Sequence, residues 1–358
     1  MSNDVLKKWV CTKPFNYMQI DQGETFVCCP SWLAVDINDG VDNNYKRIFN
    51  NDKVTEIRKS ILDGSYRYCD HKVCPSLNNV INGKEHLDAF IPKETFIQKQ
   101  EYDVEILNLC QDLSCNFKCP SCRLKLIPNL HISNDEHLAK QVLQDEAMKS
   151  FGHSIERVIL TGSGDPLYSK IYRKWLQTAT KEKYPNLKHI QLVTNAKLLT
   201  EKMWNTFTCT DLISLIEISV DAGTKHTYEN VTRLGGDWHT LLDNIRFLSK
   251  LEDRDRRLVI SCVVSKNNYN EMSRLCDTIE DIIPLDNSGF NVSLNSRLRV
   301  TLNFRQIVNW GTYSNQDMQQ LQIFDPQHDN FDDFINQLKL IEGRTRVNHN
   351  FNHLLERL

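Results

Sequence analysis

The 358-residue sequence predicts an α/β fold built on a parallel sheet. Short apolar segments with the character of buried strands alternate with helix-like segments from residue 104 to about residue 303. The strands are almost continuously apolar, as expected in a parallel sheet covered by helices. Polar residues follow several of these strands, at the edge where parallel α/β folds place their sites.

The individual elements follow from the period of the apolar residues. The predicted strands are residues 104–109, 157–161, 189–193, 212–220, 258–264 and 298–303. Helical spacing appears at residues 168–180, 201–207, 241–251 and 270–283. An amphipathic segment at residues 331–341 predicts one more helix, packed on the sheet domain.

Three cysteines follow closely on the first strand, in the run DLSCNFKCPSCR of residues 112–123. Cys115, Cys119 and Cys122 have the spacing C-x3-C-x2-C. Three thiolates at this spacing can hold three irons of a 4Fe-4S cluster, which leaves the fourth iron open and therefore reactive. A zinc knuckle or ribbon is the alternative, because such sites also use C-x2-C pairs.

The second strand ends in Gly162, Ser163, Gly164 and Asp165. Glycines let the backbone approach a ligand closely, and a carboxylate can accept a hydrogen bond from an ammonium group. The same residues would equally suit a plain strand-to-helix turn with Pro166 at the first helical position.

Polar residues also follow the third and fourth strands. Thr194 and Asn195 end the third strand, and Ser219 and Asp221 end the fourth. Asp221 has the alternative role of a helix cap. Arg233, in the sequence TRLGG, has the alternative role of a solvated residue at a helix end.

These segments, in this order, resemble the radical S-adenosylmethionine (radical SAM) superfamily. The resemblance implies a partial (βα)6 barrel in which Cys115, Cys119 and Cys122 hold a 4Fe-4S cluster whose open iron binds SAM. Reductive cleavage of SAM then gives a 5'-deoxyadenosyl radical, which takes a hydrogen atom from the substrate. An aromatic residue often precedes the third cysteine in this superfamily, whereas this chain has Ser121.

The resemblance also implies roles for the residues at the strand ends. Gly162 to Asp165 correspond to a Gly-Gly-Glu motif, here altered, that binds the methionyl amine of SAM. Thr194, Asn195, Ser219 and Asp221 correspond to positions on the ribose side. Arg233 corresponds to an arginine that meets the SAM carboxylate in related enzymes.

The first hundred residues contain five more cysteines, Cys11, Cys28, Cys29, Cys69 and Cys74. The pattern C-x11-G-x4-C resembles the opening of the twitch and SPASM auxiliary-cluster modules, with a predicted hairpin turn at residues 21–23 and a helix at 53–62. We expect Cys11, Cys28, Cys69 and Cys74 to hold a second, auxiliary 4Fe-4S cluster. Cys29 could replace Cys28, and a structural zinc site with His71 is the alternative.

The predicted organisation is therefore a small cysteine-rich hairpin and helix module ahead of the barrel. We assign the module and its linker to residues 1–100, the barrel to 101–310 and a C-terminal helical extension to 311–358. After Cys122 only Cys209, Cys262 and Cys276 remain, without paired spacing, so the second cluster cannot follow the barrel.

Composition excludes several classes of protein. The net charge is −3 and the charged residues are well mixed, so we expect no nucleic-acid partner. The sequence has no signal-peptide pattern and no apolar run near 18 residues, so we expect a cytoplasmic protein without a membrane partner. Twelve cysteines then indicate thiolate ligands in a reducing compartment, not disulfides.

The predicted function is a radical SAM oxidoreductase of the maturase type. It would abstract hydrogen from a peptide or protein, or from a sugar or nucleotide, and then oxidise the substrate or form a bond. The auxiliary cluster would accept an electron, and a flavodoxin or ferredoxin would supply electrons. The alternative is a non-catalytic zinc-binding or iron–sulfur-binding interaction protein built on a decayed barrel.

Overall fold

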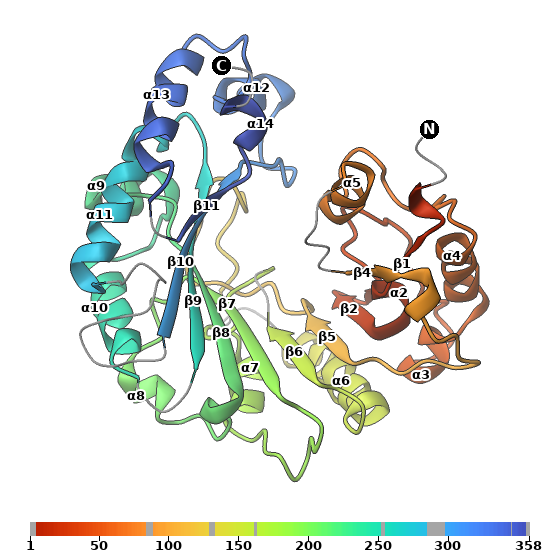
Figure 1. Cartoon of the computed structure of the whole chain (residues 1–358). Helices are drawn as coiled ribbons and strands as arrows, with labels where there is room; N and C mark the ends of the chain where they lie inside the picture. The colour runs from red at the N-terminus through yellow and green to blue at the C-terminus, as the bar shows by residue number, and fades with distance from the viewer. Residues whose placement is uncertain are drawn as a thin grey trace. The chain divides into compact units, whose positions relative to one another are not determined.

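The chain divides into two compact units in the computed structural model, which describes residues 5–83, 89–128, 133–160, 163–251, 255–284, 298–344 and 346–355 (Figure 1). The N-terminal unit comprises Met1–Asp112, Ile132–Ser163 and Ala179–Ile190. The C-terminal unit comprises Leu113–His131, Gly164–Thr178 and Gln191–Leu358. The domain boundaries expected at residues 100 and 310 stay a prediction.

The N-terminal unit contains a sheet with the strand order β6-β5-β2-β3. Its strands are β2 (Tyr17–Asp21), β3 (Glu24–Phe26), β5 (Ile106–Leu109) and β6 (Arg157–Leu160). Strand β5 runs parallel to both β2 and β6, whereas β2 and β3 form an antiparallel hairpin. The hairpin predicted at residues 21–23 is confirmed: Gln22 and Gly23 both have positive φ, as a two-residue hairpin turn requires.

The other strands of this unit, β1 (Trp9–Cys11) and β4 (Phe90–Pro92), pair with each other in antiparallel fashion. The predicted helix at residues 53–62 is confirmed as α4, and it begins where the Asn51 side chain accepts a hydrogen bond from the Val54 amide. The remaining helices are α2 (Lys13–Asn16), α3 (Tyr45–Phe49), α5 (Pro75–Ile81), α6 (Asn134–Phe151) and the 3-10 turn Lys93–Thr95.

A buried arginine, Arg58 of α4, joins three helices of the N-terminal unit. Its guanidinium donates to the Pro14 carbonyl and to the Phe49 carbonyl, both at 2.8 Å. The same group lies over the rings of Phe49 and Tyr102, at 4.7 and 4.6 Å from their centroids. Burial lowers the pKa of Arg58 to about 10.

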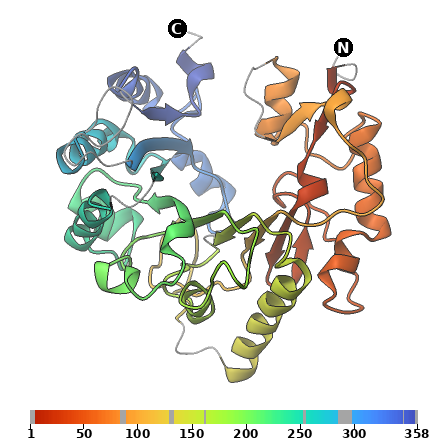
Figure 2. The same cartoon turned by 60° about the horizontal axis from the view of Figure 1, so that its bottom comes forward.

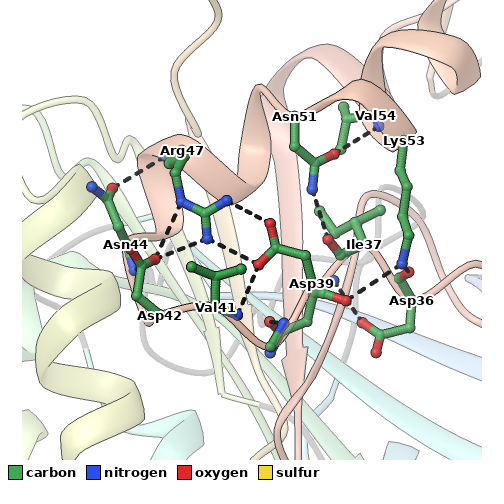
Figure 3. Close-up of polar contacts among 12 residues, drawn as sticks. Asp36, Ile37, Asp39, Val41, Asp42, Asn44, Arg47, Asn51, Lys53 and Val54 are labelled. Atoms are coloured by element: carbon green, nitrogen blue, oxygen red, sulfur yellow. Dashed lines mark hydrogen bonds and ion pairs between the residues drawn. The ribbon is translucent and has the colours of Figure 1, made fainter.

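A second arginine, Arg47 of α3, makes its contacts at the surface (Figure 3). Its guanidinium pairs with the carboxylates of Asp39 and Asp42. Hydrogen bonds from Arg47 lower the pKa of both carboxyl groups. Figure 3 also shows Asn51, whose side-chain amide donates to the Ile37 carbonyl and so ties this loop to α4.

The C-terminal unit contains strands in the order β7-β8-β9-β10-β11, of which β8 to β11 pair in parallel fashion. They are β7 (His189–Thr194), β8 (Ile213–Ser219), β9 (Arg256–Val264), β10 (Leu298–Gln306) and β11 (Val347–His349). Its main helices are α7 (Lys170–Leu176), α8 (Glu201–Trp204), α10 (Trp238–Ser249), α11 (Met272–Ile282), α12 (Asn315–Leu321), α13 (Phe331–Ile341) and α14 (Asn352–Leu355). The shorter helical segments are α9 (Lys225–Thr227), the π-helical turn Tyr228–Thr232, and the 3-10 turns Thr210–Leu212 and Tyr269–Glu271.

The six predicted strands are confirmed as β5 to β10, and the mostly parallel α/β sheet is the one that the sequence predicts. Helices α10 and α11 lie side by side along one side of β8 to β10 (Figures 1 and 2). Helix α13 confirms the amphipathic prediction and buries its apolar face. The predicted C-terminal helical extension also contains a short strand, β11, which pairs with β10. Among the described helices, none combines the length and the apolar character that crossing a membrane requires.

The contrast between the two arginines generates a stability prediction. Replacing Arg58 by Met leaves buried carbonyl groups without their donors, so we expect the free energy of unfolding to fall by about 3 kcal/mol. Arg47→Met removes only exposed ion pairs, and its loss should be clearly smaller. Urea unfolding of the metal-free protein, followed by circular dichroism, measures both. Equal losses in the two variants would contradict this view of Arg58.

Candidate functional site

The three cysteines of the C-terminal unit lie on a loop that is fixed at several points. The Cys115 amide donates to the Ile127 carbonyl at 2.9 Å, and the Lys118 amide donates to the Leu234 carbonyl at 2.9 Å. The Cys122 amide donates to the Cys119 carbonyl at 3.0 Å, which forms a tight turn between these two cysteines. Cys115 and Cys119 are buried, whereas Cys122 is exposed.

Each of these three sulfurs has a hydrogen-bond donor from a side chain. The donor–sulfur pairs are Asn195 Nδ2 with Cys115 at 3.8 Å, Arg233 Nη1 with Cys119 at 3.5 Å, and Arg123 Nη2 with Cys122 at 3.4 Å. The Phe117 amide adds a donor to the Cys115 sulfur at 3.4 Å. Donors aimed at sulfur are the usual outer partners of thiolates that bind a metal.

The protonation of the buried thiols couples metal binding to pH. Burial, together with the nearby charge of Asp165, raises the pKa of Cys115 to about 12. Burial also raises the pKa of Cys119, while the positive charge of Arg233 opposes this shift. The thiols therefore keep their protons in the metal-free protein and release them when a metal binds.

The carboxylate of Asp165 is held by four donors of the protein itself. Its Oδ2 accepts from the Thr194 hydroxyl and the Asn195 amide, both at 2.8 Å. Its Oδ1 accepts from the amides of Leu167 at 3.0 Å and Tyr168 at 3.2 Å. A carboxylate offers about four lone-pair sites, so these donors fill them. The expected contact with an ammonium group stays a prediction.

Three of the predicted residues, Asp165, Thr194 and Asn195, therefore lie together beside the cysteine loop. The Asp165 amide donates to the Ser114 carbonyl at 2.9 Å, and Asn195 Nδ2 donates to Asn116 Oδ1 at 2.8 Å. Gly164 belongs to the same unit, whereas Ser163 belongs to the N-terminal unit. The fourth residue of that motif, Gly162, lies outside the described residues.

Asp221 and Arg233 form a buried ion pair beside Cys119. Arg233 Nη2 lies 2.6 Å from Asp221 Oδ2, and the other oxygen of this carboxylate accepts from the Val263 amide at 2.7 Å. The Asp221 backbone has a φ of 55°, the left-handed conformation that aspartate tolerates better than most residues. Arg233 is only 12% exposed, so the alternative of a solvated arginine is wrong. The helix-cap alternative for Asp221 is also wrong, because Thr224 caps α9.

Two buried polar atoms next to this ion pair lack a hydrogen-bond partner among the described residues. They are Arg233 Nε and the Tyr228 hydroxyl. The Arg233 amide donates to the Tyr228 carbonyl at 2.8 Å, so the two residues are close. Buried polar groups are nearly always satisfied, and unsatisfied donors of this kind point to a polar ligand.

A cavity with about 300 Å³ of empty space, partly open to solvent, lies at the carboxyl ends of β8, β9 and β10. Its wall combines the cysteine loop with these strand ends: Pro120, Ser121, Asp221, Val231, Thr232, Val263, Ser265, Asn267, Asn268, Ile307 and Tyr313. The mixture of an aromatic ring, amides and hydroxyls suits an organic ligand with both apolar and polar groups. Ser219 ends β8 opposite Ser261 and is not among the residues of this wall.

Four cysteines of the N-terminal unit line a second cavity, with about 330 Å³ of empty space. They are the four that the sequence selects, Cys11, Cys28, Cys69 and Cys74. The rest of its wall is mainly apolar and includes Trp32, Leu33, Tyr66, Leu77 and Phe90. Cys29 does not line this cavity.

Different local structures deliver these four cysteines. Cys11 ends β1, Cys28 follows the β2–β3 hairpin, and Cys74 precedes α5, whose first residue is a proline. The Cys69 amide donates to the Tyr66 carbonyl at 2.9 Å. Burial raises the pKa of Cys11 to about 11 and that of Cys28 to about 12, while the charge of Lys13 opposes both shifts.

Neither group of cysteines has the geometry of a preformed single-ion site. Within the described residues, no three His, Cys, Asp or Glu side chains converge closely enough to hold one metal ion. A zinc site needs its ligands to meet on one atom, whereas the cysteines of a 4Fe-4S cluster bind different irons and are held further apart. His71, the expected extra zinc ligand, instead has its Nε2 3.2 Å from the Tyr66 carbonyl oxygen and does not line the cavity.

The C-terminal site lies in a segment that matches a known family. Residues 113–279 match the model of the radical SAM superfamily. The chain contains a radical SAM domain. The matched segment includes the three cysteines of the loop, Asp165 and the Asp221–Arg233 ion pair. Members of this family use a 4Fe-4S cluster and SAM.

Two solved structures show a more distant likeness. SuiB from Streptococcus suis, solved with S-adenosylmethionine, is 13% identical over 83% of this chain and 62% of that one, with a TM-score of 0.37. Archaeal TYW1 is 14% identical over 45% of this chain and 58% of that one, with a TM-score of 0.29. The chain thus spans less than two thirds of either protein. The search of curated proteins gave no match.

Sequence reasoning missed several residues of the site. Arg123 directly follows the third cysteine, so its position next to a ligand was a usable signal. Tyr228 and Tyr313 carried no such signal, because they reach the site from segments far from the cysteine loop in sequence.

The four donors of Asp165 generate a second prediction. Asp165→Asn replaces two acceptor sites by an amide that faces N–H and O–H donors, so we expect the free energy of unfolding to fall by about 3 kcal/mol. Asp243→Asn is the control, because that carboxylate forms an exposed pair with Arg246. Chemical denaturation of the metal-free protein measures both. If Asp165→Asn were as stable as Asp243→Asn, the four contacts would not be holding the site together.

Proposed function

We propose that this protein is a radical SAM enzyme that cleaves SAM reductively and abstracts a hydrogen atom from its substrate. The observation that carries the proposal is the cysteine loop of the radical SAM domain. Each of its three thiols has its own side-chain donor, and the loop borders a cavity of about 300 Å³. We expect a peptide or protein, or a sugar or nucleotide, as the substrate, and oxidation or bond formation as the outcome.

Cys115, Cys119 and Cys122 would hold the SAM cluster, and the cavity beside them would hold SAM. When bound, the cluster and SAM supply a 5'-deoxyadenosyl radical that removes a hydrogen atom from carbon. The unpaired donors Arg233 Nε and Tyr228 Oη suit a carboxylate or another acceptor on the ligand.

The other residues act on the shape and the charge of this site. Asp165 fixes the cysteine loop to the end of β7 through Thr194 and Asn195. Arg233 places a positive charge beside the Cys119 sulfur, and the ion pair with Asp221 holds the Arg233 side chain in place. Burial of Cys115 and Cys119 limits access of water to the reacting groups.

We further propose that Cys11, Cys28, Cys69 and Cys74 bind an auxiliary 4Fe-4S cluster. Their shared, mainly apolar cavity supports this assignment. Four thiolates would occupy all four irons, so this cluster would accept an electron from the substrate radical and would not bind the substrate. Such a role makes the reaction a net oxidation.

Electrons for SAM cleavage would come from a low-potential carrier such as a flavodoxin or ferredoxin. We expect the reaction to take place in the cytoplasm, where cysteines stay reduced.

The test of the proposed function is SAM cleavage by the reconstituted protein under anaerobic conditions. With SAM and dithionite we expect 5'-deoxyadenosine, measured by chromatography, and we expect Cys119→Ala to abolish it because one iron loses its ligand. Cys276→Ala is the matched control, since Cys276 is buried on α11 and should leave cleavage intact. Wild-type protein that retained only zinc and bound no SAM would contradict the proposal.

The auxiliary cluster is tested separately through iron content. Cys69→Ala combined with Cys74→Ala should lower the iron and sulfide bound per chain to about half, because two cysteines are too few to hold one of the two 4Fe-4S clusters. Cys29→Ala is the control, because this thiol does not line the cavity and should leave the content unchanged. Zinc at this site in the wild type, or a normal iron content in Cys69→Ala combined with Cys74→Ala, would overturn the assignment.

A further inference from the structure

Arg123 is a buried arginine that contacts both ends of the cysteine loop. Its Nη2 donates to the Cys122 sulfur at 3.4 Å, and its Nη1 donates to the Leu113 carbonyl at 2.9 Å. Arg123 is only 8% exposed, although the cysteine that it contacts is exposed. A guanidinium can make these two contacts at once because its donors form a rigid fork.

A second arginine of the site, Arg233, contacts the Cys119 sulfur at 3.5 Å. The Arg123 guanidinium makes the corresponding contact with the Cys122 sulfur. All three cysteines of the loop lie within electrostatic range of its guanidinium.

We propose that Arg123 is a positioning residue for the SAM cluster: it holds Cys122 in place and stabilises the reduced cluster. This inference rests on the proposed function. A reduced cluster carries one more negative charge than an oxidised one, and a fixed positive charge next to a ligand sulfur favours the more negative state. Arg123 therefore raises the reduction potential, and its contact with Leu113 limits the movement of the most exposed ligand.

The test measures iron content and reduction potential in Arg123→Gln and Arg123→Lys. The cluster of interest is recognised by an electron paramagnetic resonance signal that changes when SAM is added. At a fixed potential we expect Arg123→Gln to lower the ratio of reduced to oxidised cluster about tenfold, which is 59 mV for a one-electron couple. Arg123→Lys keeps the charge without the fork, so it should recover most of the ratio.

The matched control is Arg256→Gln in the same unit. Arg256 is also buried and donates to the carbonyls of Ile213 at 3.1 Å and Thr210 at 2.9 Å, while it stacks on Trp204. This control should lose stability without a change in potential.

The outcomes separate this inference from the proposed function. The lowered ratio expected for Arg123→Gln supports the inference. It is also supported if Arg123→Gln loads no SAM-responsive cluster while Arg123→Lys and Arg256→Gln do. A potential in Arg123→Gln equal to that of the wild type or of Arg256→Gln overturns it and leaves the proposed function intact. Wild-type protein without a SAM-responsive cluster overturns the proposed function and the inference together.

Discussion

The carboxylate of Asp165 is the contact on which the rest of the candidate site depends. Its four donors come from the turn that follows it and from the end of β7, and its own amide reaches the cysteine loop at Ser114. Asn195, held in this way, places its side chain between Asn116 and the Cys115 sulfur. Three segments that are distant in sequence thereby take up one arrangement before any ligand binds, which is what a preorganised site requires.

The side chains that contact the three cysteine sulfurs differ in charge. Two arginines approach the sulfurs of Cys119 and Cys122, whereas an amide approaches Cys115. Hydrogen bonds and charges near sulfur are among the features by which proteins set the potential of a cluster. In the N-terminal unit the cysteines instead line a mainly apolar cavity, with Lys13 as the nearby positive charge. The two groups of thiols therefore offer different surroundings to a metal centre.

Local sequence patterns predicted the helices and strands. The pairing of distant strands and the contacts of the site residues depend on long-range contacts, which such patterns do not show. Six strands followed from continuous apolar runs, and the hairpin followed from the residues Gln22 and Gly23 at its turn. The parallel pairing of β2 with β5 was not foreseen, because no local pattern says which strand a distant hairpin will join. The saturation of Asp165 and the burial of Arg233 likewise depend on partners far along the chain. β11 was missed because three residues are too few to show a period.

The central claim is that the cysteine loop of the C-terminal unit holds a cluster with an iron that is open to SAM. Electron paramagnetic resonance of the reduced Cys69→Ala, Cys74→Ala double variant tests it most directly, because two remaining cysteines are too few for the auxiliary cluster and one signal remains. The claim predicts that SAM changes the shape and position of this signal. A signal that is unaffected by saturating SAM, or one that survives when Cys119→Ala is added to the double variant, would contradict it.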